Sequence, residues 1–426
     1  MTEGMNAPLL PRLLIPRLPF FYGWVILGCV CCAGLSRQGG AVATLSVFVA
    51  PMTEEFGWSR TAISGAVSLG GILAAILAPW IGRLLDREGA RRVLCFAILA
   101  TGSAVLGLSQ VSSLWMFYAL FVVARLNFAV PFDLGIYGAV GNWFVARRPF
   151  AMSIATTAMT MGLVILPLVG QFATERGGDW RDGWLAIGVT VLVVGFIPCS
   201  LFLVRRPEDV GLVPDRQVAA ASAPPVIEPA FTRAQALRTP AFWLLSLFTL
   251  LAYPVQAGVS LHQAPFLIER GLSPTMAAGI VSFFSIASGV ASMLFGMIPA
   301  RIAVRYRLTL VGLLLATGTG LLQGVSGSSS ALVAGAFFGL GVGGLLSVLP
   351  LAWADYFGRR SYGAIRGIAL TIQVAAQATG PLMSGLLRDL TGGYETSLLV
   401  FAVLSVASLF AALLARPPVF AREASC

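Results

Sequence analysis

The chain has 426 residues, of which 57% are hydrophobic and only 11% are charged, with a formal net charge of +10. Soluble proteins carry about 25% charged residues, so this composition predicts a polytopic membrane protein. The positive charge does not indicate a nucleic-acid partner, because every basic residue is an arginine and most lie in short loops between apolar runs, as the positive-inside rule predicts.

The predicted elements are twelve apolar runs, separated by clusters of proline, glycine and charge. Each run is long enough to cross about 30 Å of hydrocarbon as a helix, so the bilayer itself is an expected partner. In chain order the predicted spans are 20–50, 59–82, 92–110, 113–145, 149–174, 183–204, 240–268, 273–300, 307–326, 329–356, 362–387 and 394–415.

A long polar stretch at 205–239 divides the spans into two groups of six and is predicted to be a flexible cytoplasmic linker. The predicted fold class is therefore an all-α polytopic membrane protein with twelve transmembrane helices in two pseudo-symmetric six-helix bundles. The bundles occupy 20–204 and 240–415, with cytoplasmic tails at 1–19 and 416–426. Arginines concentrate in the even-numbered loops, the linker and the tails, which places both termini in the cytoplasm.

An internal repeat supports the two halves. GRLLDREGARRVL, from Gly82, aligns with GMIPARIAVRYRL, from Gly296, and NWFVARR is echoed by DYFGRR, which begins at Asp355. Parallel repeats of six helices around a central site are a transporter architecture.

Arg37 and Arg125 lie deep in their spans, where a guanidinium costs several kcal/mol. At about 1.5 Å per residue, Arg37 lies roughly 24 Å from the start of its helix and Arg125 roughly 16 Å from the start of its own. Both are expected to face a wet cavity or an acid. Because a guanidinium holds a carboxylate through two parallel hydrogen bonds, the pair predicts a small-organic-anion site. The alternative is a structural strut, paired with Asp133 or with backbone carbonyls.

Asp133 is the only acid expected well inside a span, and it is the candidate for proton coupling, with a structural hydrogen bond as the alternative. His262, the only histidine, changes charge near neutral pH and is a candidate for lining the substrate cavity, against a purely interfacial role. Four more polar side chains inside spans complete the predicted substrate-binding set: Gln263, Tyr137, Gln373 and Gln377.

The stretch GRLLDREGARRVL resembles motif A of the major facilitator superfamily, and Arg125 lies where that superfamily often has an arginine. Within it, the chain is similar to the bacterial monocarboxylate and oxalate porter branch through FYGWVI, EEFGWSR, NWFVARR, RRPEDVGLVPD and DYFGRRSYGAIRG. The resemblance implies a transporter that works by alternating access. Arg37 is similar to a first-helix basic residue of monocarboxylate porters, and His262 matches a frequent histidine. The eighth span, in contrast, lacks the basic residue that family members commonly carry there.

The motif A residues are interpreted as a gate. Asp86 is expected to cap a helix N-terminus or to pair with nearby arginines, and Gly82 to permit a tight turn. Arg87 and Arg91 belong to this gate or are topology signals, and Asp355 is assigned to it from the second half.

The predicted function is a secondary active transporter in the bacterial inner membrane. It moves a small organic anion, in particular a monocarboxylate, with protons or by exchange, and it is expected to be a monomer. The rivals are a proton-coupled exporter of amphipathic or cationic compounds and a membrane receptor without flux. No enzyme, cofactor or metal is predicted, because no nucleophile, metal-ligand spacing or Walker A motif is present.

Overall fold

The structure, a computed structural model, describes residues 9–215, 229–299 and 301–419. All regular secondary structure in these ranges is helical, as predicted, and nine helical segments there are long and apolar enough to cross a membrane. The longest of them, Ala62–Leu108, makes two crossings because it breaks at Gly89. Two further long helices, α14 and α16, carry arginines that lower their mean hydropathy. The twelve-helix architecture follows.

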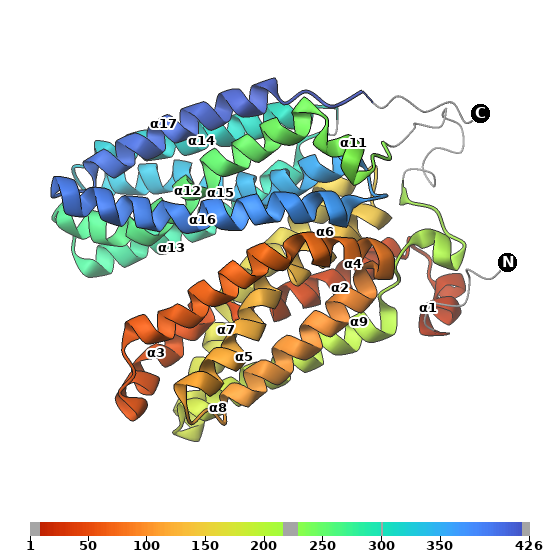
Figure 1. Cartoon of the computed structure of the whole chain (residues 1–426), viewed down its shortest axis with the longest axis horizontal. Helices are drawn as coiled ribbons and strands as arrows, with labels where there is room; N and C mark the ends of the chain where they lie inside the picture. Colours follow the sequence, from red (N-terminus) through yellow and green to blue (C-terminus); the bar gives the residue numbers. More distant parts are fainter. Residues whose placement is uncertain (1–8, 216–228, 300, 420–426) are drawn as a thin grey trace. The chain divides into compact units, whose positions relative to one another are not determined.

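Residue contacts divide the chain into two compact units. The first unit comprises Met1–Ile227 together with Tyr362–Thr371, the first ten residues of α16. Its helices, drawn from red to yellow-green in Figure 1, are α1 (Leu9–Leu14), α2 (Gly23–Arg37), α3 (Val42–Phe56), α4 (Arg60–Leu108), α5 (Leu114–Ala129), α6 (Pro131–Trp143), α7 (Arg148–Gly177), α8 (Trp180–Thr190) and α9 (Ile197–Phe202).

The second unit comprises Glu228–Ser361 and Ile372–Cys426. Within it α14 packs against α15 and α17, α13 against α15, and α12 against α17, as long helices side by side (Figure 1). Its helices are α11 (Arg233–Leu237), α12 (Pro240–Glu269), α13 (Pro274–Met297), α14 (Val304–Gln323), α15 (Ser328–Phe357), the remainder of α16 (Tyr362–Thr391) and α17 (Glu395–Leu414).

Polar side chains define where several of these helices begin. A serine, threonine or aspartate immediately before the helix accepts a hydrogen bond from a backbone N–H of the first turn, which otherwise has no partner. These N-cap residues are Ser59, Ser113, Asp179, Thr239 and Ser273.

Two spans of the first unit are broken near their middle. In the first span, a tight 3-10 turn at Gln38–Gly40 and an extended Ala41 separate α2 from α3. In the fourth span, Val130 leaves the helical conformation just before Pro131, which has no N–H to donate, so α5 ends and α6 begins. Arg37 is the last residue of α2, so it lies at one of these breaks.

The turn between the second and third spans lies at Gly89, not at Gly82 as predicted. Gly89 has φ 82° and ψ 163°, a conformation that side chains with a Cβ rarely adopt, whereas Gly82 is in the helical part of α4. The stem of Arg205 also covers Gly89, with its Cγ 2.5 Å from where a Cβ would lie. Gly89 therefore permits both the backbone turn and the close approach of Arg205.

We expect Gly89→Ala to lower the thermal unfolding midpoint of the detergent-purified protein. The positive-φ conformation alone costs about 1–3 kcal/mol for a residue with a Cβ, and the collision with Arg205 adds to it. Gly320→Ala is the matched control, because Gly320 is helical and has open space around it, so alanine there should hold or raise the midpoint. Equal midpoints for the two variants would contradict this account of Gly89.

The predicted flexible linker is ordered over part of its length. Residues 205–215 pack on the first unit and include a 3-10 turn at Pro207–Val210, and α11 begins with a capping box between Thr232 and Gln235. The flexible-linker prediction is therefore wrong for these residues. The intervening 216–228 lie outside the described residues.

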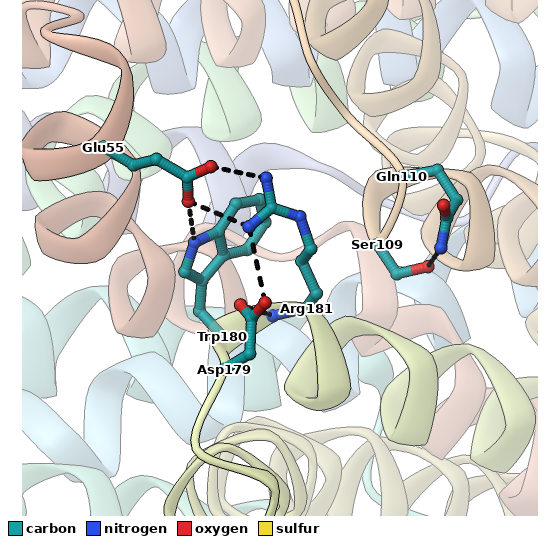
Figure 2. Close-up of polar contacts among 6 residues, drawn as sticks. All are labelled: Glu55, Ser109, Gln110, Asp179, Trp180 and Arg181. Carbon is teal, nitrogen blue, oxygen red and sulfur yellow. Dashed lines mark hydrogen bonds and ion pairs between the residues drawn. The ribbon is translucent and has the colours of Figure 1, made fainter.

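A compact polar cluster ties the end of α3 to the start of α8 (Figure 2). The Glu55 carboxylate accepts hydrogen bonds from both terminal nitrogens of Arg181, at 2.9 and 2.6 Å, and from the Trp180 indole at 2.7 Å. Arg181 also stacks over the Trp180 ring, 4.3 Å from its centroid. This cluster fixes the far end of α3, the half of the first span that the break separates from α2.

Candidate functional site

The two arginines predicted for anion binding lie on one aromatic ring. The guanidinium carbons of Arg37 and Arg125 lie 4.3 and 4.6 Å from the centroid of Phe128, so they are within about 9 Å of each other. The break at Gly40 makes this possible, since a Cβ there would collide with the Ala124 carbonyl of α5. Two positive charges this close repel each other unless an anion lies with them.

Arg37 is partly used in holding the fold. Its Nε donates to the Phe128 carbonyl at 2.8 Å, and its Nη1 donates to the Met159 sulfur at 3.1 Å. The Phe128 carbonyl is in the last turn of α5, where helix carbonyls lack helical partners. The alternative of a structural role for this arginine therefore holds for Nε and Nη1 of Arg37, which are bonded within the fold. In the described residues no hydrogen bond from its Nη2 is present.

Arg125 is the less committed of the two guanidiniums. Its Nε is buried and finds no hydrogen-bond partner among the described residues, and no carboxylate there forms an ion pair with it. Its stem packs against Gly70, where a Cβ would come 2.7 Å from the Arg125 Cβ and Cγ. Such a side chain is held in place by its carbon stem while its charged head retains hydrogen-bonding capacity.

Asp133 meets a partner that the sequence did not indicate. The carboxylate Oδ1 lies 3.4 Å from Nη2 of Arg366, and the two side chains are only 8% and 1% exposed. Arg366 is in the Tyr362–Thr371 part of α16, which belongs to the first unit with Asp133. One turn further along α6, the Tyr137 hydroxyl lies 2.8 Å from Oγ1 of Thr156. Asp133 is thus one half of a buried ion pair and does not pair with Arg37 or Arg125.

The Tyr362–Thr371 stretch, here called the docked segment, is held on α4 by Asp86. The Asp86 carboxylate oxygens accept hydrogen bonds from the backbone N–H groups of Gly363 and Ala364, both at 2.8 Å. These N–H groups start a helix, whose positive dipole end favours a carboxylate. Asp86 was predicted either to cap a helix N-terminus or to pair with nearby arginines, and in the structure its carboxylate caps a helix N-terminus. Beside it, Gly82 lies so close to the Gly363 carbonyl that a Cβ would collide with it.

The close contact between the docked segment and α4 continues for two more turns. A Cβ on Gly367 would lie 2.6 Å from the Ala78 carbonyl, and Thr371 donates its hydroxyl to the Ala75 carbonyl at 2.8 Å. Small residues at these positions let the two backbones approach, as in helix pairs inside membranes. The docked segment is therefore packed along three turns of α4.

The other predicted gate residues are placed differently. Arg87 is exposed, whereas Arg91 donates to the Ser200 carbonyl at 2.8 Å. Asp355 is half-buried near the end of α15, in the second unit.

The predicted polar residues of the second unit form two groups. His262 is hydrogen-bonded at both ring nitrogens, Nδ1 to the Tyr394 hydroxyl and Nε2 to the Pro381 carbonyl, both at 3.2 Å. Gln263 is buried, and neither its Nε2 nor its Oε1 has a hydrogen-bond partner among the described residues. Gln377 donates to Gln256 at 3.3 Å, and Gln373 is buried one turn earlier on α16.

Arg366 is the candidate site residue that the sequence did not single out. Its position just after Arg359 and Arg360 suggests a cytoplasmic loop arginine, but it lies within α16 and is 1% exposed. A signal was present, because position 366 falls four residues inside the eleventh predicted span. Nothing in the sequence pattern pairs it with Asp133, 233 positions away.

The fold is that of a multi-pass helical membrane protein, and its relatives and structural neighbours, which are transporters, make the protein a transporter and not an enzyme. The model of the Major Facilitator Superfamily matches residues 26–322, and the chain belongs to this superfamily. The described residues contain no group of three or more His, Cys, Asp or Glu side chains that would hold a metal ion.

Several curated relatives are named as monocarboxylate transporters. The chain is 26% identical over 408 residues to human monocarboxylate transporter 11, covering 91% of this chain and 82% of that protein. It is 27% identical to mouse monocarboxylate transporter 3, covering 88% of this chain and 75% of that protein.

Solved structures share the fold at lower sequence identity. The proton:xylose symporter XylE bound to 6-bromo-6-deoxy-D-glucose matches with a TM-score of 0.72 at 14% identity, over 91% of this chain and 94% of that one. The human organic anion transporter MFSD10 (TETRAN) matches with a TM-score of 0.71 at 16% identity, over 92% and 99%.

Proposed function

We propose that this transporter moves a small organic anion, in particular a monocarboxylate, across the membrane by alternating access. The single observation that carries the proposal is the pair of guanidiniums on Phe128, neither of which is bound to a carboxylate among the described residues. A carboxylate placed there neutralises part of their repulsion and accepts hydrogen bonds from Arg125 and from the unused edge of Arg37. The names of the relatives support the same class of substrate. A cationic cargo is disfavoured by the same two charges.

Ligand-induced thermal stabilisation against a panel of small carboxylates tests this proposal. A ligand that binds only the folded state stabilises it by about 2.7 kcal/mol at a hundredfold excess over its dissociation constant. We expect one carboxylate series to raise the unfolding midpoint of the wild type. No response to any carboxylate, with a response to lipophilic cations, would favour the exporter, and binding without flux in proteoliposomes would favour a receptor.

We further propose that Asp133 couples transport to protons. It is buried in an ion pair with Arg366 of the docked segment, so protonation of its carboxyl removes the charge that holds Arg366. Proton binding at Asp133 would then loosen the docked segment from α6 and α4, and deprotonation would restore the pair. Exchange without protons is the alternative. It would be favoured if Asp133→Asn left the proton dependence of uptake unchanged.

The gate we propose is the release and return of the docked segment. Asp86 and Gly82 hold its first turn, so they are proposed to stabilise the state in which the segment lies on α4. Arg91 would support this gate by fixing the third span to the Ser200 carbonyl. Arg87 and Asp355 remain proposed gate residues on the strength of the sequence motifs alone.

We expect Asp86→Asn to increase hydrogen exchange at the amides of Gly363 and Ala364 and to change the transport rate. Asparagine retains one acceptor but turns its amide group toward the second N–H, and loss of a helix cap costs about 1 kcal/mol, or roughly a fivefold rise in exchange. Glu88→Gln, which removes an exposed pair with Arg92 on the same helix, is the control. If both variants behaved like the wild type, the gating role of Asp86 would be refuted.

For cellular placement we propose the bacterial inner membrane, with both termini in the cytoplasm and the monomer as the working unit. The concentration of arginines in loops on one side supports this orientation. Labelling of a cysteine introduced near either terminus, in intact cells and in inverted vesicles, tests it.

A further inference from the structure

The segment that follows α9, Leu203–Asp215, lies along the first unit and is here called the brace. The Trp143 indole donates to the Val204 carbonyl at 3.1 Å, and the Asn142 amide lies 3.4 Å from the Arg205 carbonyl. Its buried residues are Leu203, Val204, Pro207 and Pro214. The brace is therefore attached to the end of α6 along its first half.

Its last residue, Asp215, holds the loop before α7 through three consecutive backbone N–H groups. Oδ1 accepts from Val145 at 2.6 Å and from Ala146 at 2.9 Å, and Oδ2 accepts from Arg147 at 2.8 Å. Successive N–H groups that converge on one carboxylate form an anion-binding nest, in which charge and geometry both contribute.

The brace also reaches the turn of α4. Arg205 donates from Nη2 to the main-chain carbonyl of Asp86 at 2.9 Å, and its stem covers Gly89. The Asp86 carbonyl is in the last turn before the break, where carbonyls depend on outside donors. One residue thus has its carbonyl bonded to the brace and its carboxylate bonded to the docked segment.

We propose that Asp215 and Arg205 are positioning residues for the Asp86 gate, an inference that rests on the gating role proposed above. Asp215 fixes the brace to the loop before α7, and Arg205 then holds the Asp86 backbone where its carboxylate caps Gly363 and Ala364. The brace thereby links the loop before α7 to the docked segment. Loss of either contact shifts the gate without touching the anion site.

Hydrogen exchange on the full-length protein in nanodiscs tests the proposal. We expect Asp215→Ala to raise exchange about tenfold or more at Val145, Ala146 and Arg147, because each loses a hydrogen bond to a charged group that contributes about 1.5–3 kcal/mol. It should also raise exchange at Gly363 and Ala364. Asp215→Asn should give an intermediate effect, since one oxygen can still serve two of the three N–H groups. Glu88→Gln, which removes only the exposed pair with Arg92 on α4, is the control and should leave both regions unchanged.

A double-variant comparison separates positioning from general loosening. If the brace acts through Asp86, Asp215→Ala adds no further exchange at Gly363 and Ala364 once Asp86→Asn is present. Additive effects would overturn the proposal, as would a rise confined to Val145–Arg147. If Asp215→Ala does not fold, Asp215→Asn and Arg205→Gln replace it, each measured alone and in combination with Asp86→Asn. Failure of the gate itself is recognised separately, because Asp86→Asn alone would then leave Gly363 and Ala364 protected.

Discussion

Replacing Arg125 by glutamine is expected to weaken carboxylate binding by roughly a hundredfold or more. Hydrogen bonds to a charged group contribute about 1.5–3 kcal/mol each, so loss of a two-pronged contact removes about 3 kcal/mol, and every 1.4 kcal/mol is a factor of ten. Arg125 carries this effect because its Nε has no hydrogen-bond partner among the described residues. Arg125→Lys should recover only part of the affinity, since an ammonium cannot form the planar fork.

The comparison with Arg37 makes this prediction specific. Arg37 already donates to the Phe128 carbonyl and to Met159, so Arg37→Gln should lose affinity and also lower the unfolding midpoint. Arg176→Gln is the matched control, because Arg176 also lies over a phenylalanine, 4.2 Å from the Phe172 centroid, but is exposed. The measurement is the carboxylate concentration at half-maximal thermal stabilisation. Unchanged affinity in Arg125→Gln would place the anion elsewhere.

The fold was predictable because its signal is local and repeated. Apolar runs of membrane length, with prolines, glycines and arginines between them, indicate where the helices lie, and the structure agrees for the spans beginning near Gly23, Leu114 and Pro240. The apolar runs do not show where a helix is broken within a span. The break at Gln38–Gly40 depends on how closely the turn can approach Ala124, which is a tertiary contact.

Glycines illustrate the same limit at single positions. Gly82 and Gly89 both lie in one motif, and sequence alone assigned the turn to Gly82. The positive φ is at Gly89, whereas Gly82 gives room for the Gly363 carbonyl. The missing Cβ permits a backbone turn at Gly89 and a close helix contact at Gly82, and only the three-dimensional structure distinguishes the two roles.

The two arginines of the candidate site could be recognised in the sequence because each stands alone as a charge in an apolar run. Arg366 was missed because it follows Arg359 and Arg360, and a basic cluster at a helix start is typical of a topology signal. Its partner Asp133 was recognised as unusual, but a pair 233 positions apart leaves no trace in the spacing of one sequence.

Replacing one partner of the Asp133–Arg366 ion pair is expected to produce the second large effect, a loss of stability. Removing one partner of a buried ion pair leaves the other charge uncompensated, at a cost of about 3–5 kcal/mol, so Asp133→Asn and Arg366→Gln should each lower the unfolding midpoint strongly. The double variant removes both charges and should recover most of the loss. Arg388→Gln is the control, since its pair with Glu269 is exposed and contributes about 0–1 kcal/mol at most.

The same variants distinguish a structural role of the Asp133–Arg366 pair from a role of Asp133 in proton coupling. If Asp133 carries the proton, the double variant folds but shows no proton-driven uptake, while counterflow of substrate down its own gradient continues. A double variant that regains stability and retains proton-driven uptake would make the pair purely structural. Additive destabilisation by the two changes would mean instead that the charges do not compensate each other. Because Arg366 is in the docked segment, recovery of stability together with loss of coupling would connect protonation of Asp133 to movement of that segment.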